Sequence, residues 1–373
     1  RALHWGVTLW LPMAAQGLIL SHLLWLLGRA LGWATAGRHV ALCAALAAGS
    51  AAPWVTALLM PDIFAPIAVL GLALLAFGDR LSRRQRGWAG LLASLAIAVH
   101  LTHLLIAAAC LGVVLLLRPR RLAVAALPLL AALGLLVASN IIGFGRVAVS
   151  PYGAVFALAR LVEDGPAAQV IRAACPAAGW HVCAFAGRLP ADSDDFLWNP
   201  HGPVWTAPGG APGFAPEAGV IVARTLSAYP WAVARAALGN TLRQLAMARL
   251  GDVLGPQGLE TSVTGSLRAY FPAAEMGRFH AGLQAQGRLA AVATPLNTPQ
   301  GVLLALGGLA TLWELAMAWR AGNAARAALP AMVLAAVLAN AFACGALSGP
   351  HDRYQARIVW LASLTVLIAA LTA

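Results

Sequence analysis

Two histidines three positions apart, His100 and His103, interrupt an apolar stretch of the chain. On a helix this spacing places both rings on one face. Imidazole can contact a phosphate, act as acid or base, or bind a metal ion. Three interpretations stay open: a polar pair satisfied inside a helix bundle, a phosphate contact, and a metal site whose other ligands the sequence does not identify.

A denser polar group precedes the last apolar stretch and contains His351, Asp352, Arg353, Tyr354 and Arg357. Arg353 and Arg357 are one helical turn apart, so both guanidinium groups can hold one phosphate. The alternative is structural: Asp352 caps the helix and pairs with an arginine, while Tyr354 lies at a membrane interface. We take His351, Asp352, Arg353 and Arg357 as the candidate phosphate-binding residues.

A single carboxylate, Asp62, lies between two apolar stretches. Aspartate is a common N-cap, because its oxygens accept hydrogen bonds from the free amides at a helix start. The functional interpretation is a carboxylate that faces an outer cavity, where it orients an acceptor or binds a divalent ion. Asp62, His100 and His103 are therefore the candidate catalytic residues.

The composition places these residues in a membrane protein. The chain is 61% hydrophobic and 10% charged, with a mean hydropathy of +0.78, whereas soluble domains carry about 25% charged residues. Apolar runs long enough for a ~30 Å hydrocarbon layer recur along it. We predict an all-α polytopic membrane protein with nine spans: 5–28, 40–60, 63–78, 88–100, 103–117, 122–142, 298–318, 328–347 and 357–372.

The charge pattern predicts the orientation of these spans. The net charge is +12, and every basic residue is arginine. The arginines lie mostly in short connections after the first, third, fifth and seventh spans, which marks that side as cytoplasmic and argues against a nucleic-acid partner. Abundant Ala, Gly and Arg without Lys is typical of a GC-rich bacterial genome, so we expect a multi-pass protein of the bacterial inner membrane.

Residues 88–117 form an apolar run with arginine groups at both ends. A single helix of this length would measure ~45 Å and would place one arginine group on the wrong side. We therefore predict two short helices that meet near residues 100–103. One long tilted helix is the alternative.

We expect three domains: membrane helices at 1–144, a mainly helical periplasmic insert at 145–297, and membrane helices at 298–373. Nine of the thirteen acidic residues lie in the insert. It also contains Cys175 and Cys183, eight positions apart, which we expect to form a disulfide because the periplasm is oxidising.

The predicted orientation brings the candidate residues to one membrane level. We expect Asp62, His100, His103, Asp352 and Arg353 to surround one cavity that opens to the outer leaflet. Each of these side chains is costly in a membrane unless it is paired, hydrated or bound to a ligand.

Three segments, Leu59–Phe64, Ala98–Leu104 and His351–Arg357, resemble the polytopic GT-C class of membrane glycosyltransferases. The resemblance covers the membrane part of the chain. It implies sugar transfer from a polyprenyl-phosphate donor at the periplasmic face, with membrane lipids and the donor as partners. Arg353, Arg357 and His103 would then stabilise the departing phosphate.

The class places an acidic motif, which serves as base or metal ligand, in its first outer loop. We expect this chain to start after that helix and loop, so the sequence does not assign the base, and a divalent metal ion is an open cofactor. Two other functions stay open: a lipid or solute transporter or flippase, and a non-catalytic assembly subunit whose insert binds a protein partner.

Overall fold

The computed structural model of the chain describes residues 6–372. Within that range every regular element is a helix, and no strand is present. The predicted all-helical fold is thereby confirmed.

Five helical segments among the described residues are long and apolar enough to cross a membrane. They are α1 (Trp10–Leu31), η2–α7 (Pro119–Arg121 and Leu122–Phe144), α16–η5–α17 (Leu289–Ala293, Thr294–Leu296 and Asn297–Arg320), α18–η6 (Ala324–Ala341 and Phe342–Ala346) and α19–α20 (Asp352–Val359 and Leu361–Thr372). Two shorter apolar helices cover 61–77 and 102–117. The structure thus supports a membrane protein, but the count of nine spans remains a prediction.

The range 40–60, predicted as one span, contains two helices, α2 (Ala36–Gly49) and α3 (Ala52–Ala57). Between them Ser50 has an extended backbone, and its hydroxyl accepts a hydrogen bond from the amide of Ala52. Pro53 lies in the first turn of α3, where a missing N–H costs nothing. Inside a helix, proline removes one backbone hydrogen bond and its ring clashes with the preceding turn. One continuous helix through Pro53 is therefore disfavoured, and the apolar run is divided into α2 and α3.

Residues 88–117 form a helical hairpin, as predicted. Helix α5 (Arg83–Ala98) ends before His100, and α6 (Thr102–Leu117) begins two positions after it. Asp79, just before α5, forms ion pairs with Arg118 and with Arg121 (3.0 Å), just after α6. Both arginine groups therefore lie at the same end of the hairpin.

Helix α4 (Phe64–Phe77) is the buried centre of this part of the fold. Every residue from Ala65 to Ala76 is buried, and α4 packs against α5, α1 and α6. At Gly71 the α4 backbone lies so close to α5 that an added Cβ would be 2.8 Å from the carbonyl oxygen of Ala89. The short helix η1 (Pro61–Ile63) leads directly into α4 and thereby fixes the position of Asp62.

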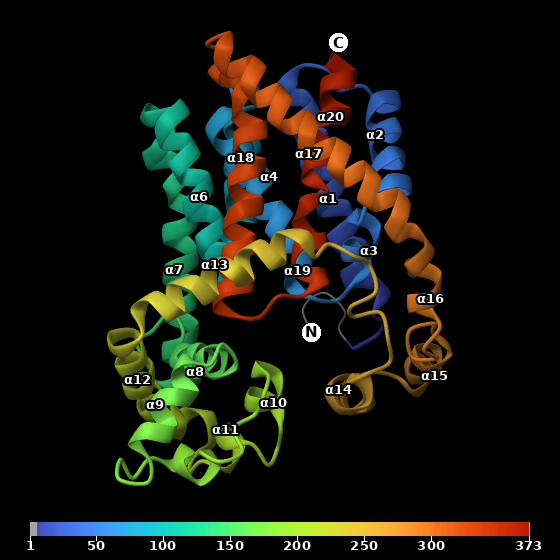
Figure 1. Cartoon of the computed structure of the whole chain (residues 1–373). Coiled ribbons are helices and arrows are strands. Elements are labelled where there is room, and N and C mark those ends of the chain that lie inside the picture. Colours follow the sequence, from blue (N-terminus) through green and yellow to red (C-terminus); the bar gives the residue numbers. More distant parts are fainter. Residues whose placement is uncertain (1–5, 373) are drawn as a thin grey trace. The chain divides into compact units, whose positions relative to one another are not determined.

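The chain forms two compact units. Unit 1 contains residues 1–131, 247–340 and 351–373, and unit 2 contains 132–246 and 341–350. In unit 1, α17 and α20 lie side by side (Figure 1). The predicted insert, 145–297, contributes residues to both units, and its location in the periplasm remains a prediction.

Unit 2 has its own apolar core, made by α8 (Gly153–Glu163), α9 (Pro166–Ala174) and α12 (Gly210–Ala228). Fully buried side chains in it include Leu158 and Phe196. Further helices of this unit are η3 (His181–Phe185), α10 (Ser193–Trp198), α11 (Pro203–Thr206) and α13 (Pro230–Ala246). In unit 1 the segment after α13 forms η4 (Glu260–Thr264), α14 (Gly265–Tyr270) and α15 (Ala273–Ala281).

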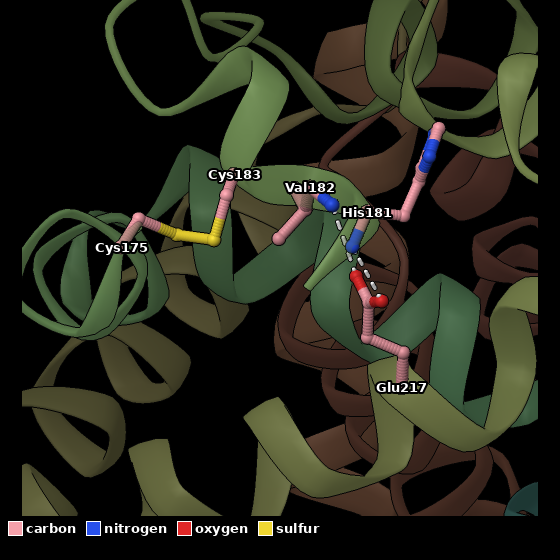
Figure 2. The surroundings of a disulfide bond; sticks show 5 residues. All are labelled: Cys175, His181, Val182, Cys183 and Glu217. Carbon is pink, nitrogen blue, oxygen red and sulfur yellow. Dashed lines mark hydrogen bonds between the residues drawn. A yellow bond between two sulfur atoms is a disulfide. The ribbon is translucent and has the colours of Figure 1, made fainter. Parts of the chain in front are cut away.

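The predicted disulfide between Cys175 and Cys183 is present, with an S–S distance of 2.01 Å. Figure 2 shows that the same loop is also held by Glu217 of α12. The carboxylate of Glu217 accepts hydrogen bonds from the amides of His181 (2.7 Å) and Val182 (3.0 Å). The disulfide and this carboxylate together fix the loop onto the core of unit 2.

Candidate functional site

The polar group at 351–357 occupies the start of α19, in unit 1. His351 has an extended backbone, and the helix begins at Asp352. The one-turn spacing brings Arg353 and Arg357 to the same aromatic ring: their guanidinium carbons lie 4.7 and 5.3 Å from the ring centroid of Tyr354. The predicted juxtaposition of the two arginines is therefore real, but their surroundings differ.

Arg357 is fully buried and is held by three other segments. Its Nη1 lies 3.2 Å from Oδ1 of Asp62, and its Nη2 donates to Thr102 at 2.9 Å. Nε and Nη2 both donate to Oδ1 of Asn340, at 3.1 and 2.8 Å. Burial of a guanidinium is tolerated when its charge is paired and its N–H groups are hydrogen-bonded. Arg357 therefore connects α19 with η1, α6 and α18.

Arg353 is partly exposed, and its guanidinium contacts a phenol and a sulfur rather than a carboxylate. Nη2 lies 3.0 Å from the hydroxyl of Tyr354, and Nη1 lies 3.7 Å from the sulfur of Met60. These weak partners leave the cation able to bind an anion, because a planar guanidinium holds phosphate oxygens in pairs. Of the two arginines, Arg353 is the one that fits a phosphate-binding role.

The segment after α13 is tied to the start of α19 by two carboxylates. Asp352 accepts a hydrogen bond from the amide of Arg249 (2.8 Å), and Asp252 accepts one from the amide of Arg353 (3.2 Å). His351 lies 3.6 Å from Asp252. The His351 ring, followed by the Arg353 amide, outweighs burial and lowers the pKa of Asp252 below its usual value. Asp352 thus has a structural partner, although it does not cap α19: the N-cap position is His351, and no side chain of the described residues caps the helix.

The two histidines lie at the junction of α5 and α6, with ring centroids 5.3 Å apart. His100 Nδ1 is 2.8 Å from the hydroxyl of Thr102, which also contacts Arg357. His103 is fully buried, and its Nδ1 lies 2.6 Å from the carbonyl oxygen of Ala96, which fixes that nitrogen as the donor. Its Nε2 has no hydrogen-bond partner within residues 6–372.

A small cavity of about 20 Å³ lies beside the polar cluster. Asp62 and Arg353 both line it, together with the segment Arg249–Leu254. A space of this size can hold about one water molecule. Of the five residues that we expected around one cavity, Asp62 and Arg353 line this one, whereas His100, His103 and Asp352 do not. A cavity that opens to the outer leaflet remains a prediction.

A much larger apolar groove of about 540 Å³ lies between α1, α2 and α3. Its walls include Trp10, Leu20 and Leu46, and Thr56 of α3 completes one side. The opposite side of α3, with Val55 and neighbouring residues, lines the small cavity. One short helix therefore separates the apolar groove from the cavity that contains Asp62 and Arg353.

Asn340 and Asp252 belong to this cluster, and the sequence did not identify either as a candidate. Asn340 lies within an apolar run and was overlooked there, although a polar side chain inside a membrane helix indicates a candidate functional site. Asp252 lies about 100 positions before α19, and no local pattern connects it with Arg353.

The described residues thus combine a half-exposed cation, a carboxylate at the same cavity, and an adjoining apolar groove. That combination suits an amphipathic ligand with an anionic head. In the described range no group of three or more His, Cys, Asp or Glu side chains is placed to hold a metal ion. No family model, curated protein or solved structure matches the chain.

Proposed function

We propose that this chain is a glycosyltransferase of the bacterial inner membrane that uses a polyprenyl-phosphate sugar as donor. The observation that supports it most is the position of α3, between an apolar groove and a cavity lined by Asp62 and Arg353. A lipid phosphate has the same two parts: an apolar chain and an anionic head. In this proposal the prenyl chain lies in the groove and its phosphate contacts Arg353.

The reaction is a displacement at the anomeric carbon of the donor sugar. The acceptor hydroxyl oxygen forms a bond to this carbon while the bond from the carbon to the phosphate oxygen breaks. The electron pair of the broken bond stays on the phosphate, whose growing negative charge Arg353 stabilises. The proton of the acceptor hydroxyl passes to a base.

Asp62 is the carboxylate that we assign to the acceptor. Arg357 contacts its Oδ1, which leaves Oδ2 for a hydroxyl group. Because Asp62 is paired with the buried guanidinium of Arg357, its carboxylate is held in a fixed orientation. Arg357 is then a positioning residue, and Thr102 and Asn340 hold it in turn.

The proposal is tested by lipid binding to the purified full chain in detergent. The probe is undecaprenyl phosphate, and the readout is the midpoint of thermal unfolding. The phosphate-free alcohol undecaprenol is the matched lipid. Arg353→Ala should abolish the extra stabilisation by the phosphate form, and Arg353→Lys should restore only part, because an ammonium group cannot reproduce the planar fork.

Arg326→Ala is the control variant, since Arg326 pairs with Glu314 and does not line the cavity or the groove. It should leave the response to undecaprenyl phosphate unchanged. The proposal is wrong if undecaprenol stabilises the wild type as much as the phosphate does, or if Arg353→Ala binds the phosphate normally. Transfer of labelled sugar from polyprenyl-phosphate donors then separates an enzyme from a flippase, which would move the lipid without breaking a bond.

A further inference from the structure

Another pocket, of about 460 Å³, lies in unit 1 among the arginine groups that flank α5 and α6. Arg83 and Arg86 of α5 and Arg121 of η2 line one part of it. Leu75, Val124 and Leu127 supply apolar walls. Its volume is in the range of ligand-binding pockets, about 300–1,000 Å³.

The charge around this pocket is strongly unbalanced. Seven arginines lie within residues 79–86 and 118–121, against one carboxylate, Asp79. Asp79 pairs with Arg118 and Arg121, both on the α6–α7 side. No ion pair within the described part of the chain neutralises Arg83 or Arg86, so the pocket presents an excess of positive charge.

Two glycines of α5 make room beside these arginines. Gly87 and Gly90 both line the pocket, and a Cβ added at Gly87 would meet no atom within 4 Å. The open space therefore continues from the cationic end along the apolar surface of the helix. A free inorganic anion would use only the arginines, whereas an acyl chain would also use these apolar walls.

We propose that this pocket binds one anionic phospholipid, with the phosphate against Arg83, Arg86 and Arg121 and an acyl chain beside Gly87 and Gly90. Basic pockets between membrane helices are suited to anionic headgroups. Arginine favours this contact because its fork donates two hydrogen bonds to phosphate oxygens. The site shares no residue with the proposed donor site, so either can fail without the other.

The test is native mass spectrometry of the full chain released from phosphatidylcholine nanodiscs that contain a minor share of phosphatidylglycerol. The wild type should retain one phosphatidylglycerol in preference to phosphatidylcholine. Arg83→Gln and Arg86→Gln should each weaken this retention about fivefold, the effect expected of one lost basic contact. Arg84→Gln is the matched control, because Arg84 is exposed and does not line the pocket.

A second pair of variants tests the apolar part. Gly87→Leu should abolish retention while every arginine remains, because the side chain fills the space of the acyl chain. Gly112→Leu is its control: Gly112 is an exposed glycine of α6 with no atom within 4 Å of an added Cβ.

Three results would overturn the proposal. The first is equal retention of both phospholipids by the wild type, and the second is equal loss in the Arg84→Gln and Arg86→Gln variants. The third is unchanged retention in Gly87→Leu, which would show a diffuse attraction to the arginines without a pocket. Gly87→Leu keeps every charge and replaces a glycine inside a helix, which favours the helical conformation. Misfolding of this variant would therefore be recognised by a midpoint of thermal unfolding below that of Gly112→Leu.

Discussion

Asp62 and Arg357 form a buried ion pair although 295 positions separate them in the sequence, with Nη1 and Oδ1 3.2 Å apart. The side chain of Arg357 is fully buried and that of Asp62 is 4% exposed. The pair joins the entry of the central helix α4 to α19. It therefore fixes the distance between the carboxylate of the candidate site and Arg353, which lies one turn earlier on α19.

Asp62→Asn should destabilise the protein by about 3–5 kcal/mol, because it leaves the charge of Arg357 buried without its partner. The measurement is unfolding of the purified protein in detergent. The double variant Asp62→Asn with Arg357→Met should lose less than the sum of the two single variants, since it removes both charges together. Additive losses would show that the two residues stabilise the fold separately.

Removing the disulfide should destabilise unit 2 alone. Cys175→Ser with Cys183→Ser opens a loop of eight positions, for which chain entropy predicts a loss of about 2–3 kcal/mol. The change should make residues near 175–190 more sensitive to limited proteolysis, although Glu217 still holds the His181 and Val182 amides. Cys43→Ala, which removes a free thiol, should leave the cleavage pattern unchanged. Equal cleavage of the wild type with and without reductant would contradict this expectation.

The sequence predicted local features better than distant partnerships. The Cys175–Cys183 bond follows from a short spacing, and the α5–α6 hairpin follows from arginine groups at both ends of one apolar run. The break at Ser50 was missed because the run of apolar residues outweighed the signal of Pro53. The partners of Arg357 could not be deduced, because Asn340, Thr102 and Asp62 lie on different helices and only three-dimensional packing brings them together.

The same limit applies to the candidate site. Periodicity placed Arg353 and Arg357 on one side of a helix, and both do contact Tyr354. It did not distinguish their burial, since this depends on what η1, α6 and α18 place opposite each arginine. The sequence therefore identified both arginines, but it did not show that Arg357 is held by Asp62, Thr102 and Asn340 of the same chain.

Acid should weaken the connection between α15 and the start of α1. Glu275, 3% exposed, accepts hydrogen bonds from the Leu9 amide (2.8 Å) and the Thr8 hydroxyl (3.0 Å). Burial raises the pKa of Glu275, but these bonds and Arg278 outweigh it, so the pKa lies below the usual 4.5. A carboxylate whose pKa is lower in the folded state than in the unfolded state stabilises the fold at pH values above its unfolded-state pKa. This contribution is lost as the pH falls through the folded-state pKa.

Thermal unfolding at neutral pH and at about pH 4 or below tests this expectation. Glu275→Gln should have a lower midpoint than the wild type at neutral pH, and the difference should shrink in acid. Arg278→Gln is the control with a small effect, because its side chain is 67% exposed and exposed ion pairs contribute little. A constant difference between wild type and Glu275→Gln at every pH would show that the carboxylate charge is not involved.

The crossing of α4 and α5 should depend on the absence of a side chain at Gly71. A Cβ there would lie 2.8 Å from the carbonyl oxygen of Ala89 and 2.9 Å from the Cβ of Ala93. The first contact is with backbone, which cannot rotate away, so Gly71→Ala must separate the two helices. We expect a loss of about 1–3 kcal/mol, the usual cost of overpacking a core, and a lower midpoint of thermal unfolding in detergent.

Gly112→Ala provides the matched control, since an added Cβ there meets nothing within 4 Å. It should be neutral or stabilising by up to ~1 kcal/mol, because alanine is the better helix former. Adding Ala93→Gly to Gly71→Ala removes one of the two close contacts and should recover part of the lost stability. Because α4 also fixes the position of Asp62, Gly71→Ala should weaken the response to undecaprenyl phosphate, and Gly112→Ala should not. If Gly71→Ala is as stable as Gly112→Ala, the close crossing does not control the packing of α4.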